Sequence, residues 1–260
     1  MYISRIKLFN WKNFHDCEVV LSERCFIVGA NATGKSNFLD VIRFMRDIVK
    51  QGGGLQAAVA LRGGLKKIRC LSARQKTEVC IDVDICENGQ SSPKWRYSLE
   101  LSNKGGGIQK PYPLVNREIA YNYYTKETVL DRKYNSKGED SETLKFTHLE
   151  QPTANAEFRE IKDVFQTTEY LNVIPQFVRD ADSVMLSSGM EDYFGRNFME
   201  RLSLLNTATR NKYLKIINEV LLTAVPQLEN LSFVKDEKGV PHIEAKYNHW
   251  RAKGSKQNEK

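Results

Sequence analysis

One glycine-rich segment has the residue types and the spacing of a phosphate-binding loop. Residues 29–36 read GANATGKS and satisfy the pattern G-x-x-x-x-G-K-[ST]. The segment follows the apolar run CFIV and precedes a stretch with helical spacing, which is the strand, loop and helix order that this motif requires. In that order, backbone N–H groups form a nest for phosphate oxygens, and the helix N-terminus adds positive potential at the same point.

Two side chains of the motif have separate expected tasks. Lys35 is expected to reach the β- and γ-phosphates of a nucleotide. The Ser36 hydroxyl is expected to bind Mg²⁺, a hard ion that prefers oxygen ligands and keeps several waters. A plain glycine turn is the structural alternative. A pure structural scaffold is a further alternative, and it would have to explain an intact Lys35–Ser36 pair.

The elements expected to position the loop are a β-rich start and one amphipathic helix. Apolar residues alternate along residues 3–8, and CEVVL and CFIV follow as two more short apolar runs, which predicts three strands. Helical spacing then runs from Ser36 to Lys50, and the glycines at 52–54 end the helix. The apolar positions of this helix are Phe38, Leu39, Ile42, Met45 and Val49.

The rest of the chain changes from strand-like to helical patterns. Alternating segments between about residues 70 and 147 predict a meandering antiparallel sheet. Beyond Pro152 the spacing is helical, and a predicted hairpin follows. The predicted strands are KTEVCIDVDI, KWRYSLEL, REIAYNYYT, KETVLDRKY and LKFTHL, the predicted helices are 154–170, 190–205 and 207–224, and the hairpin is LENLSFVKD with VPHIEAKYNHW.

These patterns divide the chain into three expected parts. Residues 1–150 are expected to form a nucleotide-binding lobe, residues 151–227 a helical lobe, and residues 228–260 a hairpin with a basic tail.

A family resemblance rests on the first fifty residues. The run ISRIKLFNWKNF, a strand pair and then GANATGKSNFLDVIRF resembles the N-terminal half of ABC-class ATPases of the chromosome-maintenance (SMC), RecF and OLD nuclease type. YLNVIPQFVRD at 170–180 is similar to a stretch of AAA/ABC-type ATPases from bacterial defence and mobile-element loci. The resemblance implies an α+β, or α/β P-loop NTPase, fold: an ABC-ATPase head with an antiparallel β-subdomain, a mixed sheet around the P-loop helix, and a helical lobe.

The resemblance also implies a ligand and the residues that contact it. The cofactors would be ATP and Mg²⁺, and the preference for ATP over GTP comes from the family alone. Gln176 would be the glutamine that senses the γ-phosphate through Mg²⁺ or water, with a solvated helix flank as the alternative. Ala32 stands where many relatives have glycine, which is tolerable if its φ is negative. The implied phosphate contacts are Asn31, Ala32, Thr33, Gly34, Lys35, Ser36 and Asn37, with Gly29 forming the turn.

No catalytic residue is identified in this sequence. Relatives have a signature motif, an apolar strand ending in Asp-Glu, and a switch histidine. VCIDVDI at 79–85 comes too early, and LSSGM at 186–190 is followed by amphipathic helices and reads as a helix cap. We therefore expect a fragment that cradles the nucleotide but lacks the acid and base for hydrolysis.

Three functional readings follow. The resemblance implies a head that closes as a homodimer around ATP and couples hydrolysis to DNA-related or antiphage-defence work, with an effector nuclease as a further partner. A nucleotide-binding module without turnover is the second reading. Another P-loop NTPase, a kinase or GTPase, fits worse, because a sheet meander follows the first helix and no lid or NKxD element is present.

Charge and cysteine usage bear on partners and location. The net charge is +7, and residues 62–76 hold six bases and no acid, which makes this basic cluster a candidate for DNA binding, with a solvated face as the alternative. Five cysteines without a two-residue gap, and no apolar run of membrane-spanning length, predict a cytoplasmic protein without a membrane partner. The six bases are Arg62, Lys66, Lys67, Arg69, Arg74 and Lys76.

Overall fold

The chain divides into two compact units, Met1–Glu169 and Tyr170–Lys260. The computed structural model describes residues 1–72, 77–105, 111–136, 140, 142–176, 192–248 and 256–259. Within that part, no helix combines the length and the apolar character that crossing a membrane requires.

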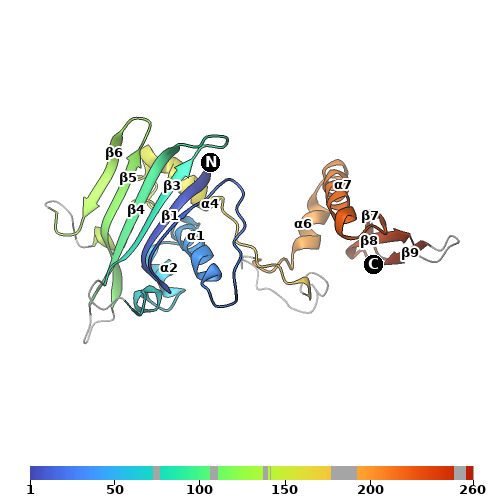
Figure 1. Cartoon of the computed structure of the whole chain (residues 1–260), viewed down its shortest axis with the longest axis horizontal. Helices are drawn as coiled ribbons and strands as arrows, with labels where there is room; N and C mark the ends of the chain where they lie inside the picture. The colour runs from blue at the N-terminus through green and yellow to red at the C-terminus, as the bar shows by residue number, and fades with distance from the viewer. Residues whose placement is uncertain are drawn as a thin grey trace. The chain divides into compact units, whose positions relative to one another are not determined.

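The first unit is built on a six-stranded sheet in which every described pairing is antiparallel. The strand order is β2-β1-β3-β4-β5-β6, so the N-terminal hairpin lies at one edge and β3 returns beside β1 (Figure 1). The strands are β1 (Tyr2–Trp11), β2 (Phe14–Val20), β3 (Val79–Cys86), β4 (Pro93–Lys104), β5 (Tyr112–Asn122) and β6 (Glu127–Lys133).

Helices cover one face of this sheet (Figure 1). The longest, α1 (Lys35–Val49), packs its buried face on the inner face of β1, where Ile6 and Leu8 are fully buried. Burial of each large apolar side chain stabilises the unit by roughly 1.5–3 kcal/mol. The shorter helices are α2 (Leu55–Ala60), α3 (Leu65–Ile68), η1 (Thr143–Lys145), η2 (Ala156–Phe158) and α4 (Arg159–Gln166).

The helix after the loop matches the sequence prediction closely. Phe38, Met45 and Val49 are buried, as their spacing predicts, whereas Leu39 is 39% exposed. Helix α4 belongs to the first unit, because Ile161 is fully buried in its core. This unit therefore extends past residue 150, where the pattern changes in the sequence.

Two predicted strands do not form. The run CFIV at 25–28 is irregular, and Phe26 and Val28 are 83% and 89% exposed, because no described strand lies alongside to pair with it. Without that strand, the sheet against which α1 packs is antiparallel throughout the described residues rather than mixed. LKFTHL forms η1 and a turn instead of a strand, because its amides at His148 and Leu149 bind the buried Glu118 carboxylate rather than a neighbouring strand.

The second unit combines helices with a small antiparallel sheet. Helix α7 has the predicted bounds, and Asn206 caps it by accepting a hydrogen bond from the N–H of Thr209 at 2.8 Å. The predicted hairpin is confirmed, and the polar tail adds a strand that its composition does not predict. The elements are α6 (Phe198–Leu204), α7 (Thr207–Ala224), β7 (Leu228–Lys235), β8 (Pro241–Asn248) and β9 (Lys256–Glu259), with strand order β7-β8-β9.

A buried carboxylate ties the sheet to the segment after β6. Glu118 is fully buried and accepts hydrogen bonds from the Tyr97 hydroxyl at 2.7 Å and from the amides of His148 and Leu149 at 2.9 and 3.1 Å. It also pairs with the buried guanidinium of Arg132 at 2.9 Å. Burial, together with the Glu118 charge, raises the pKa of Tyr97 well above its usual value.

We expect Glu118→Ala to lower the free energy of unfolding by about 3–5 kcal/mol, because it leaves the Arg132 charge buried without its carboxylate. Urea unfolding at neutral pH measures the change. Glu127→Ala, at an exposed position on β6, is the matched control and should stay within about 0.5 kcal/mol of the parent. Equal stability of the two variants would contradict this account of the core.

Candidate phosphate-binding site

The predicted phosphate-binding loop runs over the surface of the first unit. Side chains of the loop donate hydrogen bonds to its own backbone carbonyls. The Lys35 ammonium donates hydrogen bonds to the carbonyls of Gly29 at 2.7 Å and Ala30 at 2.6 Å. The Thr33 hydroxyl donates to the Ala30 carbonyl at 2.9 Å. An ammonium has three N–H donors, so Lys35 retains one for a further acceptor such as a phosphate oxygen.

The loop leads directly into an open helix N-terminus. The first helical hydrogen bond runs from the N–H of Phe38 to the Gly34 carbonyl at 2.9 Å, so the N–H groups from Gly34 to Asn37 have no acceptor inside the helix. The N-cap residue, Gly34, makes no side-chain cap, and the first turn of α1 has no acidic residue. The structure therefore brings the predicted loop residues and this set of free N–H groups together, with the helix dipole directed at the same point.

Ser36 is the residue that the sequence predicts as a Mg²⁺ ligand, and this role stays a prediction. Its side chain is exposed on the first turn of α1, and within the described residues its hydroxyl has no hydrogen-bond partner. The described part of the chain contains no group of three or more His, Cys, Asp or Glu that could hold a metal by itself. A cation here would therefore take one protein oxygen and complete its shell with phosphate oxygens and water, as Mg²⁺ does.

The backbone at Ala32 departs from what the sequence predicts. Its φ is +64°, whereas an alanine was expected to be tolerable at this position with a negative φ. The left-handed conformation crowds a Cβ atom against the following carbonyl oxygen, a clash that glycine avoids. The loop therefore contains local strain at a position where glycine would have none.

We expect Ala32→Gly to raise the free energy of unfolding by about 0.5–1 kcal/mol, because relief of this strain exceeds the entropy that glycine adds to the unfolded chain. Ala30→Gly is the matched control: Ala30 is exposed on the same loop and its φ is not positive. The control should be neutral or destabilising. Thermal unfolding of both variants measures the difference, and a less stable Ala32→Gly would refute the strain.

Trp11 fixes the position of the loop, although its spacing in the sequence does not single it out. Its fully buried indole donates a hydrogen bond to the carbonyl of Asn37 at 2.8 Å and packs on Phe44 at 5.2 Å between ring centroids. In the sequence, only its place in the run ISRIKLFNWKNF, which carries the family resemblance, points to it. One aromatic side chain thus joins β1 to the first turn of α1.

The basic cluster at 62–76 loses its first member to the protein interior. Arg62 forms ion pairs with Asp40 and Asp47, at 2.8 and 2.9 Å, and its side chain is only 9% exposed. Burial disfavours the charged form of Asp40, but hydrogen bonds from Arg62 and Lys12 outweigh it and lower the pKa of this carboxyl. Arg62 is therefore unavailable to nucleic acid, contrary to the sequence prediction.

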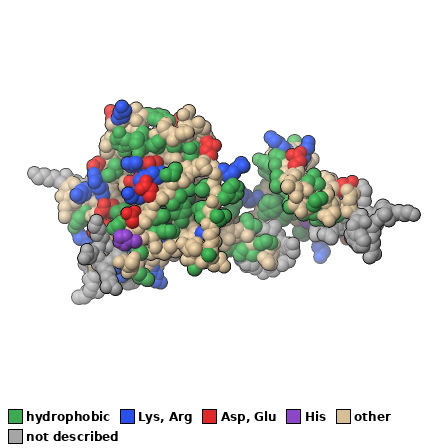
Figure 2. Space-filling model, viewed as in Figure 1, with side chains coloured by type: hydrophobic (Ala, Val, Ile, Leu, Met, Phe, Trp, Pro, Cys, Tyr) green, Lys and Arg blue, Asp and Glu red, His purple; other side chains and the backbone are tan. Residues whose placement is uncertain are grey.

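The other bases of the cluster differ in their exposure. Lys66 and Lys67 are exposed on α3, Arg69 is half-buried, and Arg74 and Lys76 lie outside the described residues. On the face of the first unit shown in Figure 2, acidic and basic side chains are interspersed. This face is therefore not a patch of one sign. Elsewhere in the described residues of the first unit, Arg5 likewise pairs with Glu18, Asp82 and Asp84, which brings charges of both signs together.

Three other features considered in the sequence are not seen beside the phosphate-binding loop within the described residues of the first unit. Gln176 is exposed and belongs to the second unit, so its proposed contact with the γ-phosphate stays a prediction. The LSSGM segment at 186–190 lies outside the described residues. Asp82 lies within β3 and pairs with Arg5 at 2.8 Å, so it does not stand at the end of an apolar strand as a catalytic acid would.

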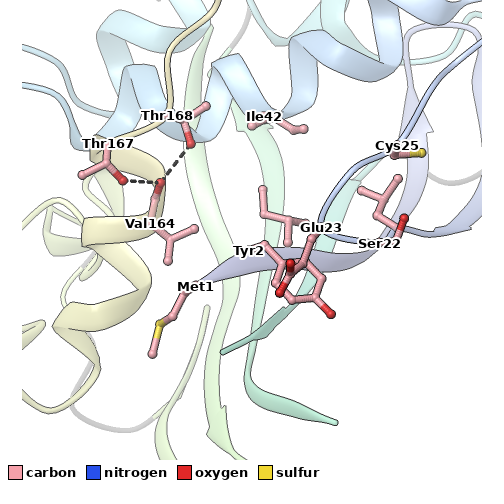
Figure 3. A pocket seen from close by; sticks show the side chains of 11 residues that line it. Met1, Tyr2, Ser22, Glu23, Cys25, Ile42, Val164, Thr167 and Thr168 are labelled. Atoms are coloured by element: carbon pink, nitrogen blue, oxygen red, sulfur yellow. Dashed lines mark hydrogen bonds between the residues drawn. The ribbon is translucent and has the colours of Figure 1, made fainter. Parts of the chain in front are cut away.

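A cavity of about 390 Å³ lies beside the segment that leads into the loop. Met1, Tyr2, Glu23 and Cys25 contribute to its lining, and the hydroxyls of Thr167 and Thr168 donate to the Val164 carbonyl on its far side (Figure 3). Among the described residues that line it, none belongs to the phosphate-binding loop and none is a lysine or arginine. This cavity is therefore distinct from the candidate phosphate site.

Comparisons with known proteins identify the family to which the chain is similar. Residues 25–175, more than half of the chain, match the family described as "AAA domain, putative AbiEii toxin, Type IV TA system". Residues 3–45 match the P-loop containing region of AAA domain. No curated protein matches the chain. A crystal structure of the SmcHead bound to the C-winged helix domain of ScpA aligns with 94% of this chain and 68% of that chain. The sequence identity is 13% and the TM-score is 0.44, so the likeness is slight.

Proposed function

Because this chain belongs to that P-loop AAA domain family, we propose that it binds Mg²⁺-ATP, with the nucleotide phosphates in the loop of residues 29–36. The Lys35 ammonium and the N–H groups from Gly34 to Asn37 would bind phosphate oxygens, and Ser36 would bind Mg²⁺. Asn31, Ala32 and Thr33 would complete the cradle. The bound cation would neutralise charge on the phosphates.

The observation that carries this proposal is the uncapped N-terminus of α1. Protein helices commonly satisfy their first N–H groups with a capping side chain, but α1 has none and no acidic residue in its first turn. Lys35, the only charged side chain from Gly29 to Asn37, lies against the loop carbonyls. The arrangement has positive potential and open donors, which suit an anion with several oxygens.

Hydrolysis needs a carboxylate or another polar group that orients water, in addition to this cradle. The two carboxylates of α1, Asp40 and Asp47, are both paired with Arg62 and do not serve that role. The loop residues Ala30 to Thr33 are exposed, so the nucleotide would remain open to solvent on one side. We therefore assign turnover to an assembly in which a second head closes over the loop, with Gln176 near the γ-phosphate, rather than to this chain alone.

The proposed biological role rests on the family resemblance. We propose that ATP-dependent closure of two heads serves DNA-related or antiphage-defence work, including control of an effector nuclease. The resemblance of residues 1–50 to SMC, RecF and OLD-type ATPases supports this role. Of the basic cluster, only the exposed Lys66 and Lys67 support DNA contact within the described residues.

We expect Lys35→Ala to weaken ATP binding roughly 10–100-fold, because a charge-assisted hydrogen bond contributes about 1.5–3 kcal/mol. Titration calorimetry with Mg²⁺ measures the affinity, and phosphate release in the same preparation measures turnover. Lys66→Ala, an exposed lysine of the same unit, is the matched control and should bind like the parent.

The outcomes separate the parts of the proposal. Binding that is lost in Lys35→Ala, with turnover absent from both proteins, supports an ATP cradle that needs a second head. Turnover by a chain that light scattering shows to be a monomer would mean that a catalytic carboxylate lies within these residues. Equal binding by the parent and Lys35→Ala would refute the assignment of the loop.

A further inference from the structure

A two-residue turn joins β1 to β2 beside the phosphate-binding loop. Trp11 pairs with Phe14 across the hairpin, and Lys12 and Asn13 form the turn, with Lys12 at φ +50°. The N–H of Lys12 donates to the Ile68 carbonyl at 2.6 Å. This hydrogen bond ties the turn to the end of α3, which is outside the phosphate-binding loop.

Asn13 uses its side-chain amide to contact two segments of the loop. Its Oδ1 accepts a hydrogen bond from the Asn37 Nδ2 at 2.7 Å. Its Nδ2 donates to the Thr33 carbonyl at 3.5 Å, a long and weaker bond. Thr33 and Asn37 lie on either side of the Gly34–Lys35–Ser36 segment, so one side chain spans the part of the loop that faces phosphate.

The turn also packs directly against the backbone of the loop. A Cβ atom placed on Gly34 would lie 2.4 Å from the Asn13 Nδ2 and 3.0 Å from the Phe14 ring, so neither residue leaves room for a side chain there. The φ of Gly34 is +103°, in the region that favours glycine. The hairpin turn thus contacts the loop where its backbone enters α1.

We propose that Asn13 is a positioning residue for the nucleotide phosphates, which acts by holding Thr33 and Asn37 in the phosphate-binding conformation. The inference rests on the proposed binding of ATP at this loop. A loop that is held in advance loses less conformational entropy when its ligand binds. Without the Asn13 amide, that ordering takes place during binding and lowers the affinity for any polyphosphate, whatever base it carries.

Asn13→Ala tests the inference when ATP and inorganic tripolyphosphate are titrated in parallel with Mg²⁺. We expect about tenfold weaker binding of both ligands, by the same factor, because the effect passes through the phosphate cradle. The midpoint of thermal unfolding without ligand should change by less than about 2 °C, since Asn13 is exposed. Asn103→Ala, an exposed asparagine on β4, is the matched control and should bind like the parent.

Asn37→Ala reaches the same hydrogen bond from the helix and serves as a second variant. Because Asn13 and Asn37 form one contact, the double variant should lose little more affinity than the more affected single variant. Additive losses would mean that the two residues act independently, and would overturn the inference.

Other results would overturn either the role of Asn13 or the proposed binding of ATP. Unchanged affinity in Asn13→Ala, a loss for ATP but not for tripolyphosphate, or a large drop in the ligand-free unfolding midpoint would each overturn the positioning role. A parent protein that binds neither ligand would refute the proposed function as well. Binding by the parent and by Asn13→Ala alike, with none by Lys35→Ala, would refute only the role of Asn13.

Discussion

The indole of Trp11 joins the two parts of the first unit on which the candidate site depends. Its ring is buried between β1 and α1, and its N–H binds the Asn37 carbonyl at 2.8 Å. A buried aromatic side chain with a satisfied polar atom gives both apolar burial and a defined direction. The first turn of α1, and with it the N–H groups proposed to face phosphate, is therefore fixed to the end of β1 rather than left to the loop alone.

The charges along α1 favour an anion at its N-terminal end. At the N-terminal end, Lys35 and the free N–H groups leave positive potential exposed. One turn further along and beyond, Asp40 and Asp47 are neutralised by Arg62, which also packs over the Phe44 ring at 5.0 Å. The acidic groups of the helix thus stabilise its packing and do not oppose an anion at its start. The same pairing removes Arg62 from the basic surface.

The sequence predicts the local features of this chain better than the distant pairings. The GANATGKS spacing identifies the loop, and the apolar periodicity predicts α1 and the bounds of α7, because both depend on neighbouring residues. The exposed run at 25–28 was not predictable in this way, since a strand needs a partner that periodicity does not reveal. The positive φ of Ala32 depends on the conformation of the whole loop, which the motif spacing does not give. The Asp40–Arg62 and Asn13–Asn37 contacts join residues 22 and 24 positions apart, so local patterns do not predict them.

Hydrogen exchange of the loop amides tests the central claim most directly. Residues 29–37 would be followed with and without Mg²⁺-ATP, alongside Lys35→Ala under the same conditions. The account predicts that ATP slows exchange at the amides of Gly34 to Asn37 in the parent and much less in the variant, because these N–H groups acquire phosphate acceptors. Tight ATP binding without any slowing at these amides would place the phosphates elsewhere and contradict the account.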